Sequence, residues 1–405
     1  MLVQKMVPMT KDVDALFTRS FIFVMAITCG VCAGANYYNQ PLIYAIAASL
    51  SVTVEQAAAT IVLNQFAYAL GLIVLIPLGD KFSKRKLVIG LMVTSAIAQI
   101  AIGFSTQLWA LYIFTFLATL FSVASQVLIP FISSLGSVEK MSQIIGTLMS
   151  GLFLGILLAR AYAGFISTFA DWHTVYLTSG GLLLVLAFIM YLKLPVSEHN
   201  PSIRLGSIYQ SMWKIAGESP QLLRRGLVGA LSFGSVILAL STMAFVLANP
   251  PYHFSELEIG LFGLVGAAGV FATRWAGQRI SLKQENLVAY IASFSLILQW
   301  LLLCFAQYSL IAYIVGLLCG YFGISVMHVL NQSLILRNAG QQRSRKHSLY
   351  MFMYFLGAAF GSMAGLYAWS EWGWYGCCAL GLTFAVLMLV VDRVDHHFNL
   401  KKIVQ

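Results

Sequence analysis

Long apolar runs occupy most of the chain, and short polar or Pro/Gly-containing connections separate them. An α-helix needs about 20 apolar residues to cross the hydrocarbon core of a bilayer. Backbone amides cannot be left unpaired in that core, so runs of this length predict membrane-spanning helices. Twelve such runs lie at about 20–48, 57–79, 87–105, 108–135, 144–169, 174–194, 226–248, 258–279, 287–306, 308–336, 348–369 and 373–391. The sequence therefore predicts an all-α membrane protein with twelve transmembrane helices.

The composition excludes an ordinary soluble protein. Hydrophobic residues make up 60% of the 405 residues and charged residues only 9%, whereas a soluble domain carries about 25% charged residues. No paired carboxylates, metal ligands or nucleophile–base pair fall at membrane depth. The six cysteines all lie in apolar runs, where we interpret them as small buried hydrophobic residues. We expect neither enzyme activity nor a cofactor or metal.

The positive charges lie almost entirely in every second connection between the apolar runs. With the N-terminus inside, 22 of the 24 Lys and Arg residues are cytoplasmic, and none is in an external loop. Their positions are 5, 11, 19, 81, 84, 85, 86, 140, 193, 204, 214, 224, 225, 279, 283, 337, 343, 345, 346, 393, 401 and 402. Such a bias predicts that both termini are cytoplasmic. It also accounts for the net charge of +10 without a nucleic-acid partner.

The two halves of the chain resemble each other at an offset of about 202 residues. Val127-Leu128 recurs as Val329-Leu330, and Leu154-Gly155 recurs as Leu356-Gly357. Six spans return the chain to its starting side, so the halves form a parallel repeat. We predict six-helix bundles at 1–194 and 226–405, joined by a cytoplasmic linker at 195–225. The glycines of the fifth and eleventh spans predict close helix packing.

The connection after the second span runs from Pro77 to Lys86 and contains Gly79-Asp80-Lys81 and Lys84-Arg85-Lys86. It resembles the major facilitator signature G-x-x-x-D-[RK]-x-G-[RK]-[RK], with Ile76 and Ser83 in place of two glycines. The resemblance implies the major facilitator fold. It also implies that Asp80, Lys81 and Arg85 form a cytoplasmic gate between the halves. The alternative is that the basic run only anchors the topology.

Further stretches resemble a bacterial drug or metabolite efflux subgroup of the DHA1 type. They are Asn36-Tyr37-Tyr38-Asn39-Gln40-Pro41 in the first span, 121–128 and 154–160 in the fourth and fifth spans, and 328–333 with 343–345 around the tenth. The chain departs from this subgroup at Thr115, where an Arg is usual, and in the fifth span, which lacks the usual Gly-Pro. These departures argue against proton coupling by the usual route.

Polar residues within the spans are the candidates for a transport site, because such residues are costly in lipid. None of the fourteen acids lies mid-span, whereas Arg160 lies mid-span in the fifth run and Arg274 lies in the cytoplasmic half of the eighth, from where it could extend toward the cytoplasm. In the family that the chain resembles, the first, fourth, seventh and tenth spans line a central cavity. The substrate-binding candidates are Asn36, Tyr37, Tyr38, Gln40, Gln65, Gln126, Arg160, His328, Asn331 and Gln332. His328 is also the candidate for proton coupling, with a neutral buried histidine as the alternative.

These features predict a secondary transporter in the bacterial inner membrane that exports a small organic molecule by alternating access. The cavity cations and amides favour a neutral or anionic substrate, with proton antiport as one form of coupling. The alternative is an uptake permease or facilitator for a nutrient or siderophore-like metabolite. We expect the lipid bilayer, the small-molecule substrate and protons as partners, no nucleic acid, and a functional monomer.

Overall fold

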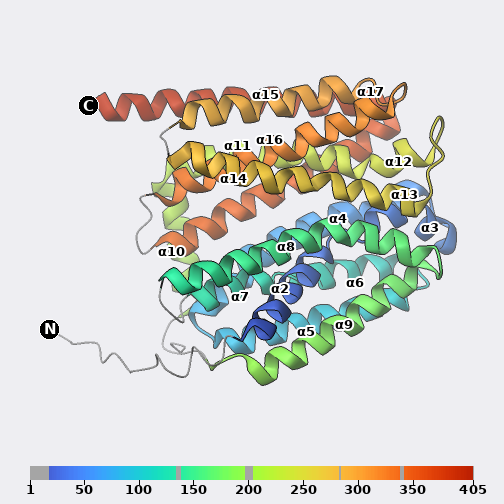
Figure 1. Cartoon of the computed structure of the whole chain (residues 1–405), viewed down its shortest axis with the longest axis horizontal. Helices are drawn as coiled ribbons and strands as arrows, with labels where there is room; N and C mark the ends of the chain where they lie inside the picture. Colours follow the sequence, from blue (N-terminus) through green and yellow to red (C-terminus); the bar gives the residue numbers. More distant parts are fainter. Residues whose placement is uncertain (1–17, 134–137, 197–203, 282–283, 338–341, 405) are drawn as a thin grey trace.

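The computed structural model describes residues 18–133, 138–196, 204–281, 284–337 and 342–404, and every regular element in these ranges is a helix. Lys5, Lys11 and Lys283, used above in the charge argument, lie outside the described residues. The helices form two bundles that lie side by side (Figure 1). The N-terminal half contains α2 (Arg19–Gly34), α3 (Asn39–Leu50), α4 (Val54–Val74), η1 (Ile76–Asp80), α5 (Lys84–Gly103), α6 (Leu108–Phe121), α7 (Ala124–Ser133), α8 (Val138–Ser167) and α9 (Trp172–Lys193).

The C-terminal half follows α10 (Leu205–Glu218), which lies at one end of the bundles (Figure 1). This half contains α11 (Pro220–Ser241), α12 (Met243–Ala248), α13 (Glu256–Leu261), η2 (Phe262–Ala267), α14 (Ala268–Ser281), α15 (Glu285–Leu303), α16 (Leu310–Leu336) and α17 (Arg343–Val404). We call the end of the molecule where α10 lies the α10 end, and the opposite end, where α3 and α13 meet, the α3 end. Helix α2 begins at the α10 end, and α17 finishes there.

Twelve membrane crossings follow from the helix lengths. Within the described ranges, ten helices are long and apolar enough to span a bilayer, and α2 with α3, bent by 50°, makes one more. One of the ten, Arg345–Phe398, has 54 residues and breaks at Gly373, where φ is 63°. At 1.5 Å per residue this segment would be about 80 Å long, enough for two crossings of a core about 30 Å thick. The predicted fold class is therefore confirmed.

Side-chain caps mark several helix starts at the α3 end. Thr53 and Gln56 form a capping box at α4, and Ser255 and Glu258 form another at α13. Asp171 caps α9 by accepting a hydrogen bond from the Thr174 amide at 3.3 Å. These contacts pair first-turn amides that have no partner inside the helix, so the sequence itself sets where each span begins.

Glycines bring helices together in the same way in both bundles. A Cβ placed on Gly155 of α8 would lie 2.2 Å from the Cα of Gly30 in α2. In the other half, a Cβ on Gly357 of α17 would lie 2.3 Å from the Cα of Ala230 in α11. Backbones can approach this closely only without side chains. The close packing predicted for the fifth and eleventh spans is therefore confirmed, and it repeats in the two halves.

The two bundles also contact each other at both ends of the molecule. At the α3 end, Asn249 Nδ2 donates to Tyr44 Oη at 2.7 Å, and α8 packs against α13. At the α10 end, Asp80 Oδ2 of the N-terminal half lies 3.6 Å from Arg345 Nη2 of α17. Helix α4 packs against α17 between these ends. These contacts leave space for the cavity described below.

A buried ion cluster near the α10 end corrects the predicted span limits. Helix α11 starts before residue 226 and α17 continues past 391, so Arg225, Asp392 and Asp395 lie inside the bundle rather than in connections. Arg225 donates from Nη1 to Asp392 at 2.7 Å and from Nε to Asp395 at 2.6 Å. Arg224 also donates to Asp395, at 2.6 Å. Both helices extend beyond the apolar runs into charged sequence, and these charges are paired with one another inside the bundle.

Candidate functional site

A cavity of about 370 Å³ lies between the bundles and is lined by residues of both. This volume falls within the range of small-molecule sites. The N-terminal half contributes residues from the α2–α3 connection, α4, α7 and α8, and the C-terminal half contributes residues from α11, η2, α14, α16 and α17. No Asp or Glu is among the described lining residues, which include Arg160, His328 and His347.

The first span is broken where it borders the cavity. Residues 35–38 form turns between α2 and α3. Asn64 Nδ2 donates to the Asn36 carbonyl at 3.1 Å, and Ser122 Oγ donates to Asn36 Oδ1 at 3.1 Å. The Asn64 side chain thus satisfies a backbone carbonyl that a continuous helix would pair internally. The break places Asn36 and Tyr37 on the cavity wall.

Arg160 of α8 lies against this break and is 1% exposed. Its Nε donates to Gln40 Oε1, and its guanidinium carbon lies 4.6 Å from the centroid of the Tyr37 ring. Its Nη1 is buried and has no hydrogen-bond partner in the part of the chain that the structure describes. A guanidinium in this setting favours an acceptor supplied from the cavity.

His328 of α16 forms a second polar group on the opposite bundle. Its Nε2 lies 2.7 Å from Gln332 Nε2, and its Nδ1 lies 3.1 Å from Tyr350 Oη. An amide nitrogen can only donate, so with this orientation of Gln332 the Nε2 of His328 accepts. Nδ1 then carries the proton and donates to Tyr350. The arrangement holds one neutral tautomer, and a second proton on His328 would require Gln332 to turn its oxygen toward the ring.

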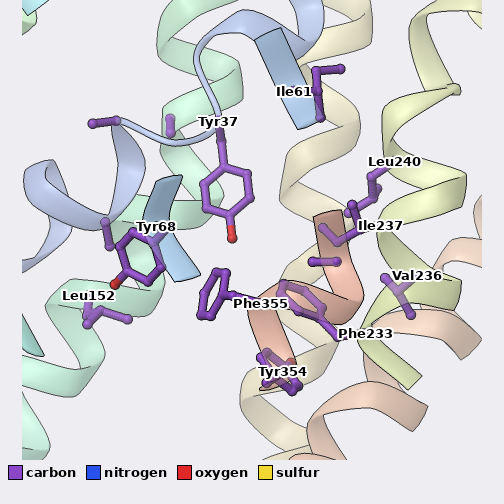
Figure 2. Packing of buried hydrophobic residues seen from close by; sticks show 14 of the residues in the cluster. Tyr37, Ile61, Tyr68, Leu152, Phe233, Val236, Ile237, Leu240, Tyr354 and Phe355 are labelled. Carbon is purple, nitrogen blue, oxygen red and sulfur yellow. The ribbon is translucent and has the colours of Figure 1, made fainter. Parts of the chain in front are cut away.

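Aromatic rings form much of the remaining wall, as Figure 2 shows. The rings of Phe233 and Tyr354 stack with centroids 4.1 Å apart. Tyr68 and Phe355 meet across the two bundles at 4.4 Å, and Tyr37 points toward Phe355 in Figure 2. The sequence reasoning missed Tyr68, Phe233, Tyr354 and Phe355, because an aromatic residue in an apolar span gives no signal of its own.

The candidate residues divide between the cavity and other places. Six of them line the cavity: Asn36, Tyr37, Gln126, Arg160, His328 and Gln332. Gln126 donates to Tyr68 Oη at 3.3 Å, and Gln40 lies behind Arg160 as its hydrogen-bond partner. Arg274, predicted in the cytoplasmic half of the eighth span, is exposed on α14 and does not line the cavity.

Three other candidates lie away from the cavity lining. Tyr38 accepts a hydrogen bond from Ser179 at 3.0 Å, inside the N-terminal bundle. Gln65 is fully buried in α4, and Asn331 accepts from Arg225 at 3.4 Å. Successive residues of a helix point in directions about 100° apart. A polar stretch in one span therefore cannot direct all its side chains into one cavity.

Of the three gate candidates, Asp80 reaches the other half. Its Oδ2 lies 3.6 Å from Arg345 Nη2 of α17. Arg85 bonds within its own half to the Tyr191 carbonyl, and Lys81 lies over the ring of Phe82. Within the described ranges, no group of three His, Cys, Asp or Glu residues is arranged to hold a metal ion.

Comparison with known proteins agrees with this architecture. The sequence pattern of the Major Facilitator Superfamily matches residues 25–362. The chain is 34% identical to the uncharacterized transporter YgaY of Escherichia coli O157:H7 over 95% of this chain and 97% of that protein. It is 22% identical to a probable sugar efflux transporter of Helicobacter pylori (strain ATCC 700392 / 26695), over 88% of this chain and 90% of the relative.

Solved structures show the same fold. The crystal structure of a mutant of the nucleoside transporter NupG superimposes with a TM-score of 0.72, at 10% identity, over 93% of this chain and 99% of that chain. Twelve crossings in two repeats, a shared cavity and a family match over most of the length lead to one assignment. The chain belongs to the major facilitator superfamily and is a membrane transporter rather than an enzyme.

Proposed function

We propose that this transporter exports a small organic molecule, neutral or anionic, across the bacterial inner membrane by alternating access. The observation that carries the proposal is the cavity lined by both bundles. If the bundles rock about this cavity, the same residues face one side of the membrane and then the other. The moving units are the segments 1–194 and 226–405, with α10 in the connection between them.

The direction and orientation rest on two separate observations. The first-span stretch resembles an efflux subgroup, and one relative is named as a probable sugar efflux transporter. The segregation of positive charges favours a cytoplasmic α10 end. Cargo would therefore enter from the α10 end and leave at the α3 end, with one chain acting alone.

The contacts between the halves suggest one gate at each end. At the α10 end, the Asp80–Arg345 pair would hold the cytoplasmic entrance closed, with Lys81 and Arg85 adding positive charge beside it. At the α3 end, the Asn249–Tyr44 bond and the packing of α8 on α13 would close the exit. Both sets are present in this structure, so each cycle would open one set at a time.

His328 would carry the proton if export is coupled to proton antiport. The titratable groups that share its surroundings are Tyr350, Tyr354 and His347, and no carboxylate is among the described residues that line the cavity with it. A proton on His328 would break the present bond from Gln332, because that bond needs a free acceptor at Nε2. Proton binding would thus change the wall that cargo contacts.

The test uses proteoliposomes with a pH-sensitive dye in the lumen and a panel of neutral sugars and aromatic acids outside. Antiport predicts that cargo entry raises the lumenal pH, because protons leave as cargo enters. His328→Gln should lose this coupling and keep downhill flux, while His173→Gln on α9, outside the cavity lining, serves as the matched control. Flux that ignores the pH gradient in all three proteins would refute antiport. A deletion strain that fails to import the compound, rather than accumulating it, would support the uptake alternative.

A further inference from the structure

We infer that Arg160 forms a carboxylate subsite and that the cargo is a small organic anion with an aromatic or apolar body. The inference rests on the proposed transport through the central cavity, and it narrows the cargo from neutral or anionic to anionic. It is argued from the hydrogen bonds of Arg160, the break in the first span and the aromatic residues of the cavity wall.

The first step concerns the charge of Arg160. In the described part of the chain no carboxylate lies within salt-bridge distance of it, and its hydrogen bond goes to the neutral amide of Gln40. The other buried arginine, Arg225, is paired with two acids. A buried cation without a counter-charge is unfavourable in a membrane protein. The missing negative charge therefore belongs to something that enters the cavity.

The second step concerns the geometry of the guanidinium. Gln40 fixes the Nε edge, and the Tyr37 ring covers one face. Nη1 remains as a buried donor without an acceptor among the described residues. A planar guanidinium held in this way presents N–H groups in a fixed direction, which suits the two coplanar oxygens of a carboxylate. A sugar hydroxyl would satisfy one donor but would leave the charge uncompensated.

The third step concerns the break in the first span. Helix α3 has 12 residues and begins at Asn39, one residue before Gln40. The N-terminus of a helix carries a partial positive charge. Because Gln40 holds Arg160, this helix end and the guanidinium lie together. Half-helices that point their N-termini at anionic groups form such sites in transporters.

The fourth step concerns the remainder of the cargo. The C-terminal bundle contributes Phe233, Tyr354 and Phe355 to the wall of the same cavity, and these three residues lie close together in Figure 2. Such rings can bind an aromatic group of the cargo by stacking or by edge contact. The cavity volume of about 370 Å³ lies near the lower end for ligand sites. The cargo is therefore expected to be small, with its carboxylate at Arg160 and its apolar body against these rings.

The experiment compares three naphthalene probes that differ in charge: 1-naphthoate, 1-naphthamide and 1-naphthylmethylammonium. Binding is measured on the full chain in nanodiscs. The proposal predicts that the acid binds at least about tenfold more tightly than the amide, which is the contribution of one charge-assisted hydrogen bond. It predicts that the cation binds most weakly. Equal affinity for acid and amide, or binding of none of the three, would overturn it.

Three variants assign the preference to the site. Arg160→Gln should remove the preference for the acid, because the acid loses a charge-assisted bond while the amide loses at most a neutral one. Arg274→Gln, which removes an exposed arginine outside the cavity, should leave the preference intact. Gln40→Glu is the decisive variant if Arg160→Gln does not fold, because it gives Arg160 an internal carboxylate in the same place. Gln40→Glu should weaken acid binding by about tenfold without affecting the amide, and unchanged acid binding would contradict the subsite.

Transport measured on the same samples separates this inference from the proposed function. If 1-naphthoate binds through Arg160 but does not cross proteoliposome membranes, the subsite stands and the proposed transport of this cargo fails. If a neutral compound is transported and Arg160→Gln has no effect on any probe, transport stands and the carboxylate subsite is refuted.

Discussion

Removal of Arg225 should be the most destabilising single charge change in the described part of the chain. Arg225 is 3% exposed, and it donates to both Asp392 and Asp395, which are 1% and 0% exposed. Arg225→Met keeps an unbranched side chain that reaches as far as the Nε of Arg225, and it removes the charge. It leaves two buried carboxylates short of a partner, and an unpaired buried charge is far more costly than a lost surface pair.

The structure sets the size of this effect. Breaking a buried ion pair from one side costs about 3–5 kcal/mol. Arg224 and Arg393 still contact the two acids at distances of hydrogen bonds, so we expect the lower end, about 3 kcal/mol. The matched control is Lys214→Met, which breaks the exposed pair with Glu218 at 3.8 Å. Such a pair contributes about 0–1 kcal/mol.

Unfolding by sodium dodecyl sulfate in mixed micelles, followed by circular dichroism, measures both variants on the same scale. Adding Asp392→Asn and Asp395→Asn to Arg225→Met should recover most of the lost free energy, because the loss comes from the uncompensated acids. The reasoning is refuted if Arg225→Met costs no more than Lys214→Met. It is also refuted if the triple variant is less stable than Arg225→Met.

Three further predictions test packing, gating and the broken span. Gly155→Ala should destabilise by several times more than any gain in helix propensity, which is at most about 1 kcal/mol, because the added Cβ meets the α2 backbone at 2.2 Å. Gly181→Ala meets nothing within 4 Å and should be neutral or stabilising in thermal denaturation. Asp80→Asn should speed the chemical labelling, from the α10 end, of a cysteine introduced into the cavity wall, by at most about fivefold. The effect is small because the Asp80–Arg345 pair is partly exposed. A larger change would mean that Asp80 holds the gate through more than this pair. Asn64→Leu should cost about 1–3 kcal/mol by leaving buried polar groups unpaired, and no change in thermal stability would show that the break needs no such support.

The span count and the fold class could be predicted from sequence because the required information is local. Each crossing needs a certain length of apolar chain, and that length can be counted without knowledge of the neighbouring helices. The close packing at Gly155 and Gly357 was also predictable, since small residues at helical spacing permit contact wherever the partner lies. The limits of the spans were less accurate. Helices α11 and α17 continue into a charged segment that is neutralised by a partner about 170 residues away.

The composition of the site depended on information that the sequence does not carry locally. Which polar residues face the cavity is set by the rotation of each helix about its own axis. Tyr37 lines the cavity while Tyr38, the next residue, contacts Ser179 within the bundle. The break at residues 35–38 adds a further change of direction. Aromatic residues such as Phe233 face either lipid or cavity according to the tertiary packing, so their role appeared only in the structure.

The charge of the cavity links the choice of cargo to the transport cycle. Without cargo, closing both gates would enclose a guanidinium that has only the Gln40 amide and the Tyr37 ring as partners among the described residues. With a carboxylate bound, the same closure would enclose a neutral pair, so an anionic cargo stabilises the closed state relative to the cargo-free one. The membrane potential also favours the export of an anionic cargo. An interior-negative potential of 100 mV favours outward movement of one negative charge by about 2.3 kcal/mol, which corresponds to about a 50-fold concentration ratio. An exporter of cations works against this potential and must be coupled to another driving force. An exporter of anions is driven by it, which gives a physical reason why the described cavity wall can hold an arginine and no carboxylate.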